Sequence, residues 1–370
     1  MRDESQEIVI VSAARTPVGK FQGVLSSLSA IDLGAIAIRE AVTRAAVNPK
    51  HIDECLMGCV LASGLGQNPA RHAALRAGLD DAVSAATINM VCGSGLKAVS
   101  LAAHAIAIGD STIVDSLIRD GLWCACEDIH MGTTAELVAE KFSISREEQD
   151  AFALESHRRA SLAQREGRFT VEITSVTISA TPSQRNAEPI TISHDESIRD
   201  NASLASLAAL RPAFKTDGTV TAGNAPGLND AAAAVVVMSA ARARALSLTP
   251  LATIRAQATT GVAPRWVMLA PITGVQKVLA RAGWPIESVD LFELNEAFSV
   301  QAIAVARELG LSPDRVNVNG GAVAIGHPIG ASGARILVTL LHEMQRRDVH
   351  RGIAALCLGG GNSVALAVER

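Results

Sequence analysis

The sequence contains no tyrosine, and aromatic residues make up only 3% of its 370 residues. Alanine and glycine are abundant in their place, and hydrophobic residues reach 48%. Small side chains favour helices that pack closely and backbones that approach one another. A chain of this length exceeds one typical domain, so we expect two or three structural units around a large core.

The chain also has little excess charge and no long hydrophobic run. Its formal net charge is −4 at pH 7, whereas nucleic-acid-binding proteins carry a basic patch. The longest apolar run, 231–241, is too short to cross a bilayer. The apolar run 8–11 is too short for the core of a signal peptide and follows acidic residues. We therefore expect a cytoplasmic protein with no nucleic-acid or membrane partner.

Six cysteines are present, but they do not form the two spaced pairs that are typical of structural zinc sites. Cys55 with Cys59, and Cys124 with Cys126, could each be half of such a site, yet neither has a second pair at the required spacing. In a reducing compartment these residues are expected to be free thiols. The sequence therefore predicts no metal.

Strand-like and helix-like segments alternate along the chain, which is typical of a layered α/β fold. In the first half we predict strands at 8–11 and 55–61 and helices at 30–46, 70–77 and 94–108. The helix at 94–108 is apolar on nearly all sides, so it should be buried. In the second half we predict strands at 289–294 and 315–319, helices at 296–309 and 331–344, and a closing hairpin of 353–358 and 364–368.

The two halves share an order of strand, elbow, Ala- and Gly-rich helix, glycine stop and strands, which indicates an internal duplication. Between them lie polar loops and charged helices, one of which opens with a capping-box sequence from Ser145 to Glu148. We expect residues 1–114 and 229–250 to form an N-terminal core half, 115–228 an inserted loop domain, and 251–370 a C-terminal core half.

Cys92 lies where a predicted strand meets the helix at 94–108, in the block VCGSG at 91–95. Unpaired N–H groups and a partial positive charge at a helix N-terminus favour a thiolate over a thiol. Gly93 and Gly95 would let a substrate approach the backbone. Cys92 is therefore a candidate nucleophile, although a small core residue at an elbow would look the same.

Three further residues are candidates for the same site. His327 has five glycines around it in the block at 320–333, in the mirror elbow of the second half, where it could take a proton from a thiol. Asn295 follows a strand and could cap a helix or hold a water for an oxyanion. Cys357 precedes three glycines and could transfer a proton at a carbon next to a carbonyl, or simply fill the core.

The blocks VCGSG at 91–95, NEAF at 295–298, GHPIGASG at 326–333 and CLGGG at 357–361 resemble the four catalytic blocks of thiolases, in family order. Supporting stretches also match, namely 15–21, 130–136, 145–150, 211–214 and 221–224. The resemblance covers nearly the whole chain. It implies a thiolase-like layered α-β-α-β-α fold built from two duplicated halves, with an inserted loop domain.

The resemblance also implies a mechanism. Cys92 would carry the acyl group as a thioester after activation by His327, and Asn295 would hold a water that binds the thioester oxygen together with His327. Cys357 would deprotonate a second acetyl-CoA, and the N–H groups of Cys92 and Gly359 would form the other oxyanion hole. Coenzyme A is then a substrate rather than a cofactor. The CoA contacts that carry over from the family are Leu122, His130, Met131, Arg211, Ala225, Leu228, Ala297 and Phe298.

The leading interpretation is an acetyl-CoA C-acetyltransferase that works as a homodimer or homotetramer. A degradative 3-oxoacyl-CoA thiolase for longer chains, a decarboxylating ketosynthase of the same superfold and an inactive acyl-CoA-binding homologue are the alternatives. The chain departs from the family at Pro226, which stands where many biosynthetic members carry a CoA-contacting serine, and at 268–271 and 362–363, beside the acyl pocket.

The largest departure is a gap after Val114. There the family has the rest of a strand, a glycine-rich stretch and a loop used in tetramer assembly. This chain has only the strand-like start 111–114 and continues directly with Asp115. Either a segment has been left out of the sequence, which we favour, or the chain is a variant that assembles as a dimer at best.

Overall fold

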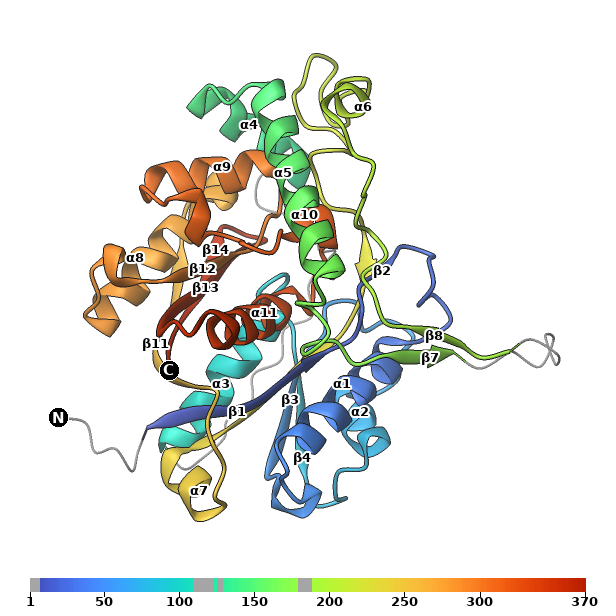
Figure 1. Ribbon diagram of the computed structural model, residues 1–370, viewed down its shortest axis with the longest axis vertical. Helices are drawn as coiled ribbons and strands as arrows, with labels where there is room; N and C mark the ends of the chain where they lie inside the picture. The colour runs from blue at the N-terminus through green and yellow to red at the C-terminus, as the bar shows by residue number, and fades with distance from the viewer. Residues whose placement is uncertain (1–6, 109–122, 125–128, 179–187) are drawn as a thin grey trace.

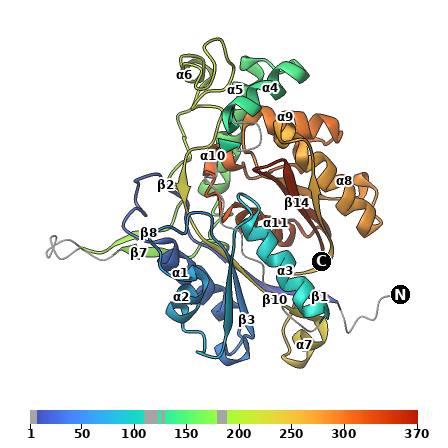
Figure 2. The same ribbon diagram turned by 180° about the vertical axis from the view of Figure 1, so that it is seen from behind.

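The computed structural model describes residues 7–108, 123–124, 129–178 and 188–370. Its main sheet has six strands in the order β10-β1-β11-β14-β13-β12 (Figures 1 and 2; β10 is labelled in Figure 2). β12 and β13 are parallel, and all other neighbours in this sheet are antiparallel. The strands are β1 (Ile8–Arg15), β10 (Ala233–Ser239), β11 (Ala252–Gly261), β12 (Leu291–Leu294), β13 (Arg351–Leu358) and β14 (Asn362–Glu369).

Helices lie on both sides of this sheet and between its halves (Figure 1). α3 and α11 pack against each other in the centre, and α11 also covers β12 and β13. α1 packs against β1 and β10, whereas α8 packs against β11, β13 and β14. These helices and their neighbours are α1 (Ala30–Arg44), α2 (Pro69–Ala77), α3 (Ser94–Ile108), α7 (Ala240–Ala245), α8 (Ala270–Ala282), α9 (Ser299–Glu308), α10 (Ala322–Ile325) and α11 (Ser332–Arg347).

The apolar runs of the sequence became the interior of this layered structure. All residues of β13 except Arg351 are buried, as are six consecutive residues of β14, because helices cover both faces of these strands. The segment 94–108 forms a helix as predicted, and so do 30–44 and 69–77 within a residue or two of the expected bounds. The closing hairpin is confirmed, with two more residues at the start of each strand and one more at the end of the second strand.

Three expectations need correction or lie outside the description. The strand predicted at 315–319 is absent, because Pro313–Arg315 forms a 3-10 turn and only Val316 makes a parallel bridge, to Phe292. α3 is not wholly buried, since His104 is exposed and Ala102 and Ala105 are half-buried. The strand-like residues 111–114 and the junction of Val114 with Asp115 lie outside the described residues.

The two halves follow one plan of strand order. In the second half, the spatial order from one edge is Val316, β12, β13, β14 and β11. In the first half, β4 (Ser84–Ile88) pairs in parallel with β3 (Glu54–Gly58), and β10 pairs with β1. Within the part of the chain that the structure describes, no strand lies between β3 and β10, where β13 would have its counterpart.

The segment between the halves carries two long helices and several short elements. α5 begins after Ser145, whose hydroxyl accepts a hydrogen bond from the Glu148 N–H at 3.2 Å, so the predicted helix start is confirmed. No helix in the described ranges is long and apolar enough to cross a membrane. The remaining elements are β2 (Gly19–Lys20), β5 (Trp123–Cys124), β6 (Ile129–His130), α4 (Met131–Phe142), α5 (Arg146–Arg165), β7 (Val176–Ile178), β8 (Ile190–Ile192), α6 (Leu204–Ala208) and β9 (Asn229–Asp230).

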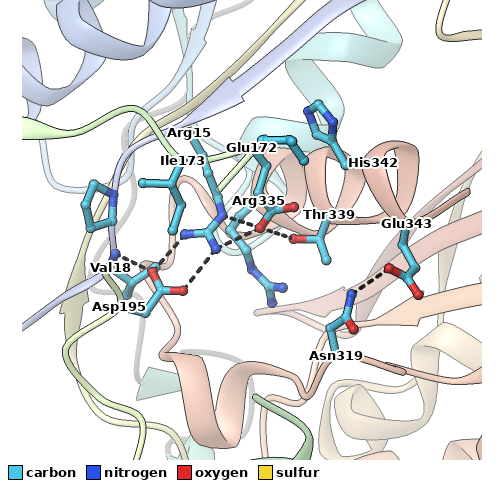
Figure 3. A network of polar contacts seen from close by, with 12 residues as sticks. Arg15, Val18, Glu172, Ile173, Asp195, Asn319, Arg335, Thr339, His342 and Glu343 are labelled. Carbon is cyan, nitrogen blue, oxygen red and sulfur yellow. Dashed lines mark hydrogen bonds and ion pairs between the residues drawn. The ribbon is translucent and has the colours of Figure 1, made fainter. Parts of the chain in front are cut away.

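A buried ionic cluster joins the segment between the halves to the core (Figure 3). Arg15, at the end of β1, donates to Glu172 at 2.8 Å and forms two hydrogen bonds with Asp195, at 2.8 and 2.9 Å. Asp195 also accepts from the N–H of Val18, and Glu172 accepts from Thr339 of α11. Arg15 is fully buried, so both carboxylates are needed to compensate its charge.

Candidate active site

Cys92 lies on a tight turn that is held by hydrogen bonds to its neighbours. The hydroxyl of Ser94 accepts from the N–H of Met90 at 2.8 Å and donates to the carbonyl of Val91 at 2.6 Å. Val91 adopts a left-handed conformation with φ of 47°, which is costly for a β-branched residue. The turn places the half-buried Cys92 two residues before α3.

The Cys92 turn touches the glycine-rich turn after β13. A Cβ added to Gly93 would lie 2.6 Å from a methyl carbon of Leu358, so only glycine fits there. A Cβ on Gly359 would lie 3.5 Å from the side chain of Val91. The structure therefore brings Cys92, Cys357 and Gly359 together, although they are far apart in the sequence.

Both cysteines of this site are thiols at rest. Burial raises the pKa of Cys92 well above its usual range, and the nearby Cys357 raises it further. Burial likewise raises the pKa of Cys357 to about 12. This differs from the expectation that the helix N-terminus favours a thiolate, because desolvation penalises the charged form more strongly. A neighbouring base is then required to make either sulfur a nucleophile or a base.

His327 lies between α10 and α11, beside the start of α3. The two central helices touch at their first turns, since a Cβ on Gly95 would lie 3.0 Å from the Ala334 nitrogen. The N–H of His327 donates to the side-chain oxygen of Asn229 at 2.9 Å, which fixes the backbone of this loop. Asn229 was not among the predicted site residues.

The hydrogen bonds of Ser332 determine the tautomer of His327. The Ser332 hydroxyl donates its single proton to the carbonyl of Pro328 at 2.9 Å. Its oxygen lies 2.6 Å from His327 Nδ1, so Nδ1 must carry a proton and donate it to Ser332. The other nitrogen, Nε2, is therefore unprotonated and can accept a proton.

The imidazole of His327 is neutral at ordinary pH. Burial, together with the positive charge of Arg335, lowers the pKa of His327 to about 4. Arg335 is buried in the first turns of α11, and its guanidinium makes no hydrogen bond to any residue that the structure describes. Its nearest carboxylate is Glu293, at 3.8 Å. This arrangement keeps His327 in the form that can act as a general base.

Asn295 follows β12 and has an unusual side chain for a buried residue. Its backbone N–H donates to the carbonyl of Ala355 on β13 at 3.0 Å. The side chain is 1% exposed, yet neither its oxygen nor its nitrogen has a partner among the described residues. Buried polar atoms without a partner are costly, so this amide is suited to hold a ligand or an ordered water.

Glu296 connects the Asn295 turn to the His327 loop. Its carboxylate accepts hydrogen bonds from Ser156, from Asn317 and from the N–H of Val323, at 2.9 to 3.0 Å. Val323 belongs to α10, which ends one residue before Gly326 and His327. The buried carboxylate thus fixes the position of the Asn295 turn relative to the loop that carries His327. Sequence reasoning assigned Glu296 to the block but not to this role.

Only some of the predicted CoA contacts lie close to one another in the structure. Met131, Ala297 and Cys357 belong to one buried cluster, against which Ala225 and Phe298 also pack. His130 stacks on Phe214 with ring centroids 4.7 Å apart, and Phe214 meets Phe298 edge to face at 6.2 Å. Phe214 was not predicted as a contact, although it stands in a family-like stretch.

The other predicted CoA contacts lie elsewhere or outside the description. Leu228 is exposed and forms an isolated bridge with His327, so it lies at the candidate site. Arg211 is exposed at the surface. Leu122 lies outside the described residues. Within the described ranges, no group of three or more His, Cys, Asp or Glu side chains is placed to hold a metal ion.

Comparisons with known proteins agree with this geometry. Residues 248–370 match the family description "Thiolase, C-terminal domain", and residues 8–114 and 108–241 match "Thiolase, N-terminal domain". The chain belongs to the thiolase family. The N-terminal match is divided at 108–114, where the sequence indicates a gap.

Individual relatives of this thiolase resemble it over almost their whole length. It is 52% identical to "Acetyl-CoA acetyltransferase" of Cupriavidus necator over 394 residues, which cover 98% of this chain and 99% of that protein. It is 48% identical to the protein of the same name from Escherichia coli, over 98% of both chains. The crystal structure of Bacillus anthracis acetyl-CoA acetyltransferase has a TM-score of 0.92 at 39% identity and covers 98% of both chains. The thiolase fold expected from the sequence is confirmed.

Replacing Ser332 by alanine tests the base in this thiolase. Without the Ser332 oxygen, His327 loses the acceptor that fixes its proton on Nδ1, so acylation should slow by up to about 100-fold. Ser100→Ala is the matched control, because Ser100 is a buried serine on α3 whose hydroxyl has no partner among the described residues. Rapid-quench measurement of acylation should show a loss in Ser332→Ala only. Equal rates in both variants would contradict the assigned tautomer.

The pH dependence of acylation follows from the lowered pKa of His327. We expect kcat/KM to fall on the acid side near pH 4 rather than near pH 6.5, the usual pKa of histidine. Because the unfolded chain binds this proton more tightly, stability should also fall as the pH drops from 6.5 towards 4. A pH profile with an acid limb near 6.5 would show that His327 is not held neutral.

Proposed function

We propose that this chain is an acetyl-CoA C-acetyltransferase. It condenses two acetyl-CoA molecules to acetoacetyl-CoA by a Claisen reaction and catalyses the reverse thiolysis. The observation that carries the proposal is the contact of two cysteine turns, with the half-buried Cys92 before α3 and the buried Cys357 at the end of β13, beside a neutral histidine. The relatives named acetyl-CoA acetyltransferase support the same activity.

The first half-reaction uses Cys92 and His327. His327 Nε2 takes the proton of the Cys92 thiol, and the sulfur attacks the thioester carbonyl of the first acetyl-CoA. The leaving CoA thiolate takes its proton from the Cys357 thiol, which is left as a thiolate, and the acetyl group remains on Cys92. A water held by the free amide of Asn295, together with His327, stabilises the negative charge on the carbonyl oxygen.

The second half-reaction uses Cys357. The Cys357 thiolate formed in the first half-reaction removes a proton from the methyl group of the second acetyl-CoA, and the resulting carbanion attacks the acetyl group on Cys92. The Cys92–acyl bond then breaks, and the released sulfur takes back the proton held by His327. The N–H groups of Cys92 and Gly359 bind the developing oxyanion. The two sulfurs have different neighbours and can be tuned separately, which suits two distinct proton transfers.

The CoA portion of the substrate lies over the segment between the core halves. His130 and Phe214 offer a stacked pair of rings, and Met131, Ala297 and Phe298 lead from that pair to the buried Cys357 cluster. Ala225, Leu228 and Arg211 extend this path towards the surface. Leu122 is proposed as a further contact on the resemblance alone.

A short acyl group fits this site better than a long one. Met268 is 2% exposed and belongs to the same buried cluster as Cys357, and the resemblance places the stretch 268–271 beside the acyl pocket, so we assign this bulky side chain to the acyl pocket. The degradative alternative requires room for a longer 3-oxoacyl chain. We therefore favour acetoacetyl-CoA over longer 3-oxoacyl-CoA substrates.

The decisive assay is thiolysis of acetoacetyl-CoA by the purified chain. Acetyl-CoA should form, and kcat/KM should exceed the value for 3-oxodecanoyl-CoA by tenfold or more, on the order of the discrimination that pocket size allows. A higher kcat/KM for the longer substrate would favour the degradative alternative. If neither substrate gives a product, the chain is an inactive acyl-CoA-binding homologue.

We also propose that the chain is a homo-oligomer. The sequence as given lacks the loop that the resemblance assigns to tetramer assembly, so this chain should form a homodimer, whereas a chain that includes the omitted segment should form a homotetramer. Light scattering coupled to gel filtration measures this directly, and twice the monomer mass of 38.4 kDa is the expected result. Four times that mass would show that assembly does not need the loop.

A further inference from the structure

The hairpin that closes the second half carries a buried serine directly opposite Cys357. β13 and β14 are antiparallel, and Cys357 is paired with Ser363 across them. Residues paired in this way lie on one face of a sheet, with Cβ atoms about 4.5–5.5 Å apart. Ser363 is therefore the cross-strand neighbour of the sulfur that we assign as the base of the second half-reaction.

Packing shows which face the two side chains share. Cys357 belongs to a buried cluster with Met268, just before α8, and Ala270, at the start of that helix. Ser363 faces the same helix, because a Cβ added to Gly274 would lie 2.5 Å from the Ser363 oxygen. α8 packs against both strands of the hairpin (Figure 2). Both side chains thus point into the layer between the hairpin and α8.

The hydroxyl of Ser363 is unpaired when Cys357 is a thiol. Ser363 is fully buried, and its oxygen has no hydrogen-bond partner among the residues that the structure describes. Gly274, which it faces on α8, has no side chain to offer one. A buried polar group without a partner is costly, so this hydroxyl indicates a partner that forms in another state of the site.

The third residue of this cross-strand row already has a partner of its own. Thr260 of β11 is paired with Ser363 on the side away from Cys357. The Thr260 hydroxyl accepts a hydrogen bond from Thr273 of α8 at 2.9 Å. Of the two side chains beside Ser363 in the sheet, only Cys357 changes its charge during the reaction.

The charge of Cys357 explains why the serine is unpaired at rest. A thiol sulfur is only a weak acceptor, so it does not hold the hydroxyl. Once Cys357 has protonated the leaving CoA thiolate, its sulfur carries a negative charge in a buried place. A hydrogen bond to a charged acceptor is about twice as strong as one to a neutral acceptor, and exclusion of water strengthens it further. Rotation of Ser363 about χ1 into another staggered position brings the hydroxyl towards the sulfur.

We propose that Ser363 donates a hydrogen bond to the Cys357 thiolate and so stabilises the base of the second half-reaction. The inference rests on the proposed function, because it needs Cys357 to become a thiolate. Ser363 keeps its proton throughout, and the methyl proton of the second acetyl-CoA goes to the Cys357 sulfur. The hydrogen bond is lost when the sulfur is protonated again, so it favours the charged state alone.

Ser363→Ala tests this hydrogen bond in the whole protein. Exchange of the methyl protons of acetyl-CoA, followed by NMR in deuterium oxide, should slow by about tenfold or more, the usual effect of losing one hydrogen bond to a charged group. The KM for acetyl-CoA in this exchange should stay unchanged, because the hydroxyl binds the sulfur and not the substrate. The loss should therefore appear in kcat alone.

Acylation by S-acetyl para-nitrothiophenol shows whether Ser363→Ala damages the site as a whole. The leaving thiolate of this reagent is stable without a proton, so its reaction needs Cys92 and His327 but not the proton of Cys357. Acylation of Ser363→Ala by this reagent should proceed at the wild-type rate. Equal losses in acylation and in proton exchange would mean that the variant disturbs the whole site, which overturns the proposal.

Thr260→Val is the matched control, since it removes a hydroxyl from the same row but one strand further from the sulfur. It should exchange methyl protons at the wild-type rate. Normal exchange in Ser363→Ala, or an equal loss in Thr260→Val, overturns the inference and leaves the proposed function intact. If the wild-type protein neither exchanges methyl protons nor gains an acetyl group on Cys92, the proposed function is wrong and this inference falls with it.

Discussion

Cys92→Ala is expected to abolish acyl transfer, with kcat lower by about 10⁴-fold or more, the usual effect of removing a catalytic nucleophile. Cys357 cannot replace it, because Cys357 is 3% exposed in the neighbouring strand and lacks the turn geometry of Cys92. Incubation of the wild-type protein with acetyl-CoA and peptide mapping by mass spectrometry should place the acetyl group on Cys92. Labelling only at Cys357, Cys124 or Cys126 would overturn the assignment.

Two companion variants separate the roles within this prediction. Cys357→Ala should still form the acyl-enzyme but should fail to exchange the methyl protons of acetyl-CoA with solvent. His327→Ala should slow acylation itself, because the Cys92 thiol then lacks its base. Proton NMR in deuterium oxide measures this exchange. A normal exchange rate in Cys357→Ala would show that Cys357 is not the base of the second half-reaction.

Asp195→Ala is expected to lower the free energy of unfolding by about 3–5 kcal/mol, since it leaves the buried Arg15 guanidinium only partly compensated. Asp195 accepts three hydrogen bonds, two from Arg15 and one from the N–H of Val18. Domain stabilities are about 5–15 kcal/mol, so such a loss is a large fraction of the total. Urea unfolding followed by circular dichroism measures the change.

The control for this prediction is an ion pair at the surface. Glu140 and Lys215 are both more than half exposed and form a salt bridge. Glu140→Ala should leave the urea midpoint nearly unchanged, because solvent screens exposed pairs. Comparable losses of unfolding free energy in Asp195→Ala and Glu140→Ala would mean that the buried partner of Arg15 stabilises the fold no more than an exposed ion pair does.

The duplicated helices and the closing hairpin could be predicted because local sequence determines them. The segment 94–108 is apolar and bounded by glycines, and 353–368 is apolar around three glycines. Both patterns are independent of distant partners. The strand expected at 315–319 was wrong because Pro313 begins a 3-10 turn and Asn317 adopts a left-handed conformation, which its side-chain bonds to Leu294 hold in place.

The sequence by itself determined the family, the four catalytic blocks and the gap after Val114, because each is a property of neighbouring residues. Only the tertiary structure decided the tautomer of His327, the free amide of Asn295, the hydrogen bonds that the Glu296 carboxylate accepts and the stacking of Phe214 on His130. Each of these depends on a contact between segments whose spacing along the chain says nothing of their distance in space.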